Sequence, residues 1–148
     1  MKIDFLQIGF QKCGTTFFAR NIYPCNPSIH CIQASHNRRL ERLLIRDFIL
    51  PDGLEYSQDV IDSALPALSE NLFDADTTNG IMFEPFTFMY QRRFDRKNVI
   101  DRIRKTLPNT KIIMFIRNQK TWILSHYSQY LKGGGAVISA RLRRVHPL

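Results

Sequence analysis

The sequence lacks the cysteine patterns that stabilise small folds. It has three cysteines, an odd number, and no two of them have CxxC spacing. Neither a disulfide framework nor a zinc site is expected, and a reducing, cytoplasmic compartment is the simplest interpretation. No apolar run has the length of a signal peptide at the N-terminus or approaches the about 20 residues that cross a bilayer. We therefore expect a soluble chain without a membrane anchor.

Negative charge is also scarce, since 13 acidic residues stand against 21 basic ones and leave a formal net charge of +8. Such an excess indicates an anionic partner, such as a nucleotide, a sulfated or phosphorylated substrate, nucleic acid or a membrane surface. The basic residues match no nucleic-acid recognition motif, so nucleic acid is not the expected partner. A hydrophobic content of 44% in 148 residues predicts a single domain with a sizeable core.

Short apolar runs alternate with amphipathic segments along the chain. The runs that predict β-strands span residues 5–8, 29–32, 81–83 and 111–116. The segments that predict helices span residues 17–23, 35–49, 58–73, 94–107 and 119–132, with Pro66 as a kink or boundary. Residues 77–80, TTNG, predict a loop. The last strand, KIIMFI, is typical of a parallel sheet with both faces covered. The alternation predicts an α/β fold with a parallel β-sheet flanked by helices.

The first apolar run ends at Gly9, and a loop with Lys12 and Gly14 separates it from a helical segment. A glycine-bearing turn between a strand and a helix aims backbone N–H groups at one point, where they can hold an anion. The spacing nearly matches the nucleotide-binding motif GxxxxGK[ST], but Thr15 stands where that motif has lysine. A phosphate-binding loop is expected, and an ordinary turn with a surface lysine is the alternative.

A second candidate anion site follows the KIIMFI strand. Arg117 lies at the carboxyl end of that strand, where ligands of open parallel sheets bind. Ser125 follows eight residues later on the expected helix. The guanidinium fork and the hydroxyl can bind one phosphate group together. With the loop, this pair suits a ligand with two phosphate-type groups, and two surface residues are the alternative.

These two motifs resemble a known family. The segment QKCGTT at residues 11–16 resembles the 5′-phosphosulfate loop of sulfotransferases. The segments IRN at 116–118 and SHY at 125–127 resemble their 3′-phosphate motif, whose arginine and serine also stand eight apart. The resemblance covers about residues 5–132 and is loose in the middle.

The resemblance implies a sulfotransferase that uses 3′-phosphoadenosine-5′-phosphosulfate (PAPS) and acts on a hydroxyl or amine acceptor, with a slight lean toward carbohydrates. It implies a P-loop NTPase-like, nucleotide-kinase-related three-layer α/β sandwich, and it requires no metal. Lys12 would steady the bridging oxygen as charge develops on the leaving phosphate, which makes it catalytic as well as cofactor-binding. The residues that the resemblance assigns to the PAPS site are Gln11, Lys12, Cys13, Gly14, Thr15, Thr16, Arg117 and Ser125.

The catalytic base is less well defined, because the family places a histidine or a glutamate near the acceptor. His36 is the first candidate by position and because imidazole changes its charge near neutral pH, and Glu41 is the second. A polar residue near a helix start is the alternative role for His36. Glu84, with Pro85 and nearby aromatic residues, loosely resembles a segment beside the acceptor cleft. Core packing is the alternative for those aromatic residues.

The expected PAPS-binding domain covers residues 1–132, and the glycine-rich, basic tail at 133–148 is expected to be disordered or aberrant. Domains of the family continue well beyond the point that Lys132 matches, so the resemblance implies a C-terminally truncated chain. The alternatives to an active sulfotransferase are a non-catalytic nucleotide- or anion-binding remnant and a P-loop kinase. The missing lysine after Gly14 and the lack of an evident acidic partner for magnesium disfavour the kinase.

Overall fold

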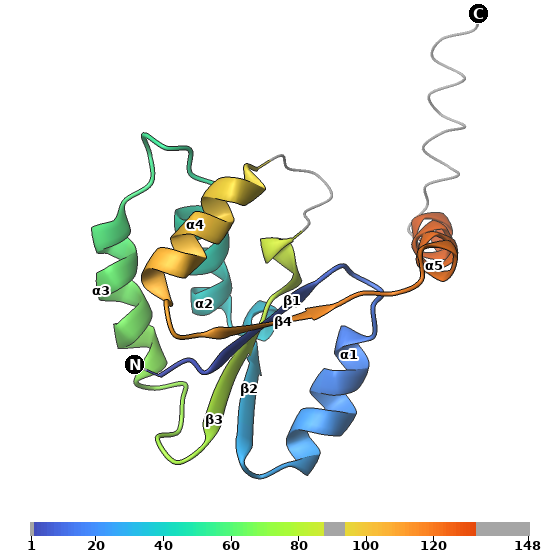
Figure 1. Cartoon of the computed structure of the whole chain (residues 1–148), viewed down its shortest axis with the longest axis horizontal. Helices are drawn as coiled ribbons and strands as arrows, with labels where there is room; N and C mark the ends of the chain where they lie inside the picture. Colours follow the sequence, from blue (N-terminus) through green and yellow to red (C-terminus); the bar gives the residue numbers. More distant parts are fainter. Residues whose placement is uncertain (1, 88–93, 133–148) are drawn as a thin grey trace, which may run out of the picture. The chain divides into compact units, whose positions relative to one another are not determined.

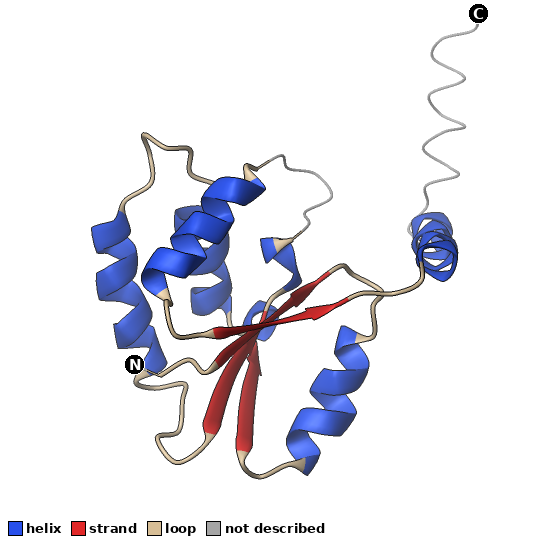
Figure 2. Cartoon of the chain, in the orientation of Figure 1, coloured by secondary structure: helices blue, strands red, loops and turns tan. Residues whose placement is uncertain are grey.

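The computed structural model describes residues 2–87 and 94–132, and it consists of two units that divide between Phe115 and Ile116. The first unit contains a four-stranded, all-parallel sheet in the order β2-β3-β1-β4 (Figures 1 and 2). Its strands are β1 (Phe5–Gly9), β2 (Ile29–Gln33), β3 (Thr78–Met82) and β4 (Lys111–Phe115). The predicted α/β fold with a parallel sheet flanked by helices is confirmed.

Helical segments connect the strands. A continuous helical stretch consists of α1 (Thr15–Phe17), a π-helical turn (Phe18–Ile22) and a 3-10 turn (Tyr23–Cys25). A second stretch consists of a 3-10 turn (Ala34–His36), α2 (Arg38–Arg42) and a π-helical turn (Leu43–Ile49). The remaining elements of the first unit are α3 (Gln58–Ser69), a 3-10 turn (Glu84–Phe86) and α4 (Arg96–Thr106). In the described ranges, no helix is both long and apolar enough to cross a membrane.

The sheet carries helices on both faces (Figure 1). Alternate residues of a strand point to opposite faces. On one face, the ring of Phe18 lies 4.3 Å from that of Phe115 between centroids, and Tyr23 packs against Phe5. On the other face, the main core unites β1 and β3 with the helices α2, α3 and α4; its fully buried members include Leu6, Leu40, Ile61, Ile81 and Val99.

Local polar groups fix where the helices begin. The Asn37 side chain accepts a hydrogen bond from the Leu40 N–H at 3.1 Å and caps α2. Asp95 accepts from the N–H groups of Lys97 and Asn98 and caps α4. These caps are of the type that satisfies the first N–H groups of a helix. Of the two roles predicted for Pro66, a kink or a boundary, the boundary is wrong, because α3 continues through it to Ser69.

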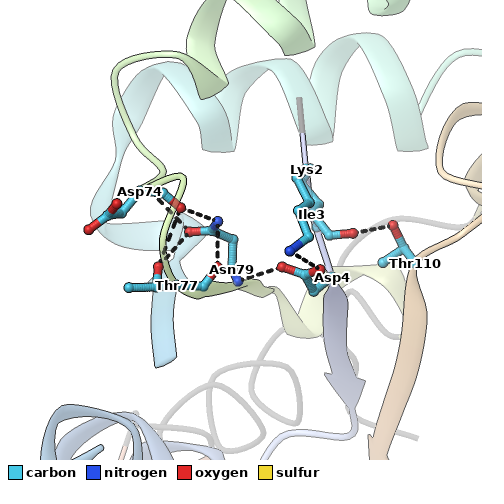
Figure 3. Close-up of polar contacts among 7 residues, drawn as sticks. All are labelled: Lys2, Ile3, Asp4, Asp74, Thr77, Asn79 and Thr110. Atoms are coloured by element: carbon cyan, nitrogen blue, oxygen red, sulfur yellow. Dashed lines mark hydrogen bonds and ion pairs between the residues drawn. The ribbon is translucent and has the colours of Figure 1, made fainter. Parts of the chain in front are cut away.

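Strand β3 begins three residues before the predicted apolar run, in a stretch expected to be a loop. Its Gly80 lies beneath the Phe5 ring, and a Cβ there would be 2.1 Å from the ring. The side-chain amide of Asn79 donates to the carbonyl oxygens of Asp74 and Thr77, while its backbone N–H donates to the Asp4 carboxylate (Figure 3). The turn-type residues therefore form a strand because long-range contacts satisfy their polar groups and close packing requires the glycine.

Strand β4 is found where the KIIMFI run predicted it, but its surroundings differ from the prediction. Among the residues that the structure describes, it pairs only with β1, at one end of the strand order. Ile112 is 48% exposed and Met114 is 51% exposed, whereas every residue of β1 is buried. The expectation that both faces of β4 are covered is wrong. An apolar run favours strand formation, but its burial depends on which elements the topology places beside it.

Candidate anion-binding loop and adjacent cavity

The loop after β1 has the backbone of a tight turn that leaves room for a ligand. Gly9 has φ 147°, and a Cβ on it would lie 2.7 Å from the carbonyl oxygen of Phe115. Gly14 has φ 92°, but a Cβ there would meet no atom within 4 Å. Lys12 has φ 65°, a left-handed conformation that is uncommon for a residue with a side chain. Gly9 thus allows close approach to β4, while the space at Gly14 is open.

The helix that follows starts directly from this loop. The carbonyl of Gly14 accepts hydrogen bonds from the N–H groups of Phe17 and Phe18, at 3.0 and 3.3 Å. The first N–H groups of a helix have no intrahelical carbonyl partner. Lys12 and Thr16 are exposed beside them, whereas Thr15 is only 4% exposed. The loop therefore combines an accessible ammonium group, an accessible hydroxyl and the start of a helix.

Two contacts tie the loop to the segment after β3. The Thr15 hydroxyl donates to the Glu84 carboxylate, and the Thr87 hydroxyl donates to the Gly9 carbonyl at 2.6 Å. The sequence interpretation did not pair Glu84 with Thr15. The signal was present, because β1 and β3 are parallel and the residues after parallel strands gather at one edge of a sheet. The sequence alone did not reveal which strands are neighbours in the sheet.

A cavity of about 220 Å³ adjoins the loop. Its lining comes from the loop, the segments after β2 and β3, and α2. The lining residues are Gln11, Gln33, Ser35, Glu41, Met82, Phe83, Glu84 and Pro85. Glu41, the second candidate for the catalytic base, therefore lies with Gln11 of the loop at one cavity. His36, the first candidate, is exposed and does not belong to this lining.

Arg117 and Ser125 lie in the second unit, which contains α5 (Gln119–Lys132). The Arg117 Nε donates to the Thr121 hydroxyl at 3.1 Å. The Asn118 carboxamide oxygen accepts from the Lys120 N–H at 3.0 Å and starts the helix. Ser125 is half-buried in the second turn of α5. The predicted helix is confirmed, and joint phosphate binding by Arg117, Ser125 and the loop stays a prediction. The predicted tail at 133–148 lies outside the described residues.

The sheet face beneath α1 holds a polar cluster with a structural role. The Tyr23 hydroxyl donates to the Gln7 side chain, which is almost fully buried. Burial raises the pKa of Cys31 to about 12, and burial with the nearby Cys31 thiol raises the pKa of Tyr23 to about 12. Such groups stay protonated at neutral pH and are poorly suited to act as nucleophiles there.

The carboxylates beside the loop do not form a metal-binding cluster of three or more side chains in the described ranges. Across residues 2–87 and 94–132, no group of three or more histidine, cysteine, aspartate or glutamate side chains is placed to hold a metal ion. The carboxylates of Glu41 and Glu84 share the cavity lining, and Thr15 contributes its hydroxyl to Glu84. This arrangement offers an anion site on one side and proton-accepting groups on the other.

Comparison with known proteins gave no match to a protein-family model, to a curated protein or to a solved structure. What the site can do chemically is therefore inferred from its own residues.

Proposed function

We propose that this protein is a sulfotransferase that transfers the sulfuryl group of PAPS to a hydroxyl or amine acceptor. The observation that carries the proposal is the juxtaposition of an open, lysine-bearing loop with a cavity that holds a carboxylate. Gln11 belongs to the loop and also lines the cavity, so the two sites are contiguous. A transfer reaction needs a donor site and an acceptor site in contact.

The loop residues suit the phosphosulfate group. The open space at Gly14 admits an anion close to the backbone, and the exposed Lys12 and Thr16 supply a charge and a hydroxyl. Cys13 and Thr15 would contribute their backbone N–H groups, in the manner of a phosphate-binding nest. The strand, loop and helix order supports the finer fold assignment, a P-loop NTPase-like three-layer sandwich. Arg117 and Ser125 would bind the 3′-phosphate.

In the proposed reaction, one residue acts on the acceptor and another acts on the donor. Glu41 takes the proton of the acceptor as the acceptor oxygen or nitrogen forms its bond to sulfur. The bond between sulfur and the bridging oxygen breaks, and its electron pair leaves with 3′,5′-adenosine diphosphate. Lys12 offsets the negative charge that develops on that bridging oxygen. Glu41 replaces His36 as the preferred base, since a base must reach the acceptor and, of these two residues, Glu41 is the one that lines the cavity.

Ligand-induced stabilisation tests the donor site. At a concentration 100 times its Kd, 3′,5′-adenosine diphosphate should stabilise the folded chain by about 2.7 kcal/mol, visible as a higher melting temperature. Lys12→Ala should lose most of that increase. The matched control is Lys105→Ala, which removes an exposed lysine from α4 and should retain the full increase.

The outcomes of binding and transfer assays distinguish the sulfotransferase from its alternatives and test the role of Glu41. Absence of any stabilisation at millimolar ligand contradicts the sulfotransferase assignment. Stabilisation without transfer of labelled sulfate from PAPS to any acceptor in a broad panel instead supports the non-catalytic remnant. Transfer that disappears in Glu41→Gln, while binding of 3′,5′-adenosine diphosphate is kept, supports the role of Glu41 as the base.

A P-loop kinase is the second candidate, and the contact between Thr15 and Glu84 favours it. P-loop phosphotransferases hold magnesium with a loop hydroxyl and an acidic residue from a neighbouring strand. The Thr15 hydroxyl and the Glu84 carboxylate are groups of these kinds, already in contact. The kinase predicts that ATP stabilises the chain more strongly with Mg²⁺ than with EDTA. The sulfotransferase predicts that stabilisation by 3′,5′-adenosine diphosphate is the same in both.

A further inference from the structure

The cavity beside the loop differs in charge from the protein as a whole. The chain carries a formal net charge of +8, yet the charged residues that line the cavity are both acidic, Glu41 and Glu84. Gln11, Gln33 and Ser35 supply the other polar lining groups. Within residues 2–87 and 94–132, an anionic group inside would face two carboxylates without a lining cation to offset them. Like charges that share a partly desolvated site repel each other, which weakens the binding of an anion there.

The size and surface chemistry of the cavity further limit which ligands fit it. A volume of about 220 Å³ is smaller than the roughly 300–1,000 Å³ of sites for drug-sized ligands, so it suits a single small ring. Amide and hydroxyl groups match the hydrogen bonds of a polyhydroxyl ring. Met82, Phe83 and Pro85 supply an apolar wall, which suits the C–H face of such a ring. A carboxylate partner also attracts an ammonium group.

We propose that this cavity binds a neutral or amine-bearing sugar unit as the acceptor and discriminates against anionic sugars. The inference rests on the proposed sulfuryl transfer for its catalytic meaning, but the selectivity itself is a property of the cavity. The donor side of the site is basic through Lys12, and the acceptor side is acidic through Glu41 and Glu84. The two sides thereby favour ligands of different charge.

Binding of three matched probes tests the inference without relying on turnover. The probes are methyl glucosaminide, methyl glucoside and methyl glucuronide, which carry a positive, zero and negative charge on one ring framework. Each is titrated by NMR into the full chain, with and without saturating 3′,5′-adenosine diphosphate. The glucosaminide should bind most tightly, and the glucuronide should bind about tenfold or more weakly than the glucoside.

A positive charge added to the cavity lining provides a specific variant. Ser35→Lys places an ammonium group at the cavity, and the exposed position of Ser35 makes the change compatible with folding. One ammonium group beside two carboxylates offsets part of their charge, so the variant should bind the glucosaminide more weakly and the glucuronide more tightly than wild type does. Ser28→Lys is the matched control, because Ser28 is exposed just before the other end of β2 and does not line the cavity. It should keep the wild-type order of affinities.

The outcomes distinguish this inference from the function on which it rests. Equal or tighter binding of the glucuronide by the wild-type chain overturns the inference, as does the absence of binding by all three probes. An unchanged ratio of the two affinities in Ser35→Lys also overturns it. Correct selectivity without binding of 3′,5′-adenosine diphosphate supports the sugar site and contradicts the sulfotransferase. Binding of 3′,5′-adenosine diphosphate without the expected sugar selectivity supports the donor site and contradicts the proposed class of acceptor.

Discussion

Strands β1 and β4 are neighbours with similar apolar sequences and very different surroundings. They pair in parallel with Leu6 opposite Ile112, so these two side chains point to the same face of the sheet. Leu6 is 1% exposed and Ile112 is 48% exposed. The difference teaches that hydrophobicity determines which segments become strands here, while strand order determines which of them form the core.

The segments that follow the two strands differ in the same way. The loop after β1 is held by contacts distant in sequence, from Thr15 to Glu84 and from Thr87 to Gly9. After β4, the hydrogen bond from Arg117 to Thr121 in the next helix is local. The proposed 5′-phosphosulfate site is therefore organised by the sheet itself. The proposed 3′-phosphate site is organised within a separate unit of the chain.

The largest expected effect comes from truncating the paired side chains of the two strands. Leu6→Ala should lower the free energy of unfolding by about 2–5 kcal/mol, because it removes a buried side chain and leaves a cavity. Ile112→Ala should cost less than about 1 kcal/mol, since much of its side chain already contacts water. Urea denaturation of both variants gives the comparison. Equal costs would show that Ile112 is buried in solution and would remove the contrast between the strands.

The next effect tests the close contact between β1 and β4 at Gly9. Gly9→Ala should cost about 1–3 kcal/mol, because the new Cβ would lie 2.7 Å from the Phe115 carbonyl oxygen at a φ of 147°. Gly53→Ala is the control, since a Cβ there meets nothing within 4 Å, and it should change stability by less than about 0.5 kcal/mol. Thermal denaturation of both variants measures the difference. A neutral Gly9→Ala would mean that the strand ends separate readily.

Much of this fold could be predicted from local patterns. The apolar runs located all four strands, and the Gly9 to Gly14 spacing located the loop. The predictions that were wrong concern features that depend on contacts between residues distant in sequence. Thr78 to Gly80 were expected in a loop because turn-type residues dominate there, but contacts with Asp4 and Phe5 make them a strand. The exposed faces of β4 were likewise unpredictable without the strand order.

The candidate site could likewise be predicted only where its residues are close together in the sequence. Lys12 and Gly14 could be identified because a phosphate-binding loop is contiguous in sequence. The contact of Glu84 with Thr15 spans 69 positions and follows from the pairing of β1 with β3. The choice between His36 and Glu41 also required the tertiary structure, since both lie in the same short interval. A cavity lining assembled from four segments leaves no single motif in the sequence.

A smaller effect tests whether the Arg117 segment acts with the loop. If Arg117 binds the 3′-phosphate, the wild-type chain should prefer 3′,5′-adenosine diphosphate to adenosine 5′-monophosphate by about tenfold or more, as expected for a charge-assisted hydrogen bond. Arg117→Ala should remove this preference and leave the affinity for the monophosphate unchanged. Calorimetric titration of both nucleotides measures it, with Arg104→Ala on α4 as the control. A preference that survives in Arg117→Ala would assign the 3′-phosphate to other residues.

The smallest effect concerns β2, the strand at the other end of the sheet order, where Cys31 is half-buried. Burial raises the pKa of its thiol from 9.0 to about 12, so the folded state keeps its proton more tightly than the unfolded state does. The resulting stabilisation is fully present below pH 9 and is lost as the pH rises from 9 to 12. Between pH 8 and pH 10, wild type should therefore lose up to about 1.4 kcal/mol more unfolding free energy than Cys31→Ala. Denaturation at the two pH values measures the difference, and burial, the larger cause of the raised pKa of Tyr23, is present in both proteins. Identical losses would show that Cys31 is solvated in the folded state, and then β2 would be as open as β4.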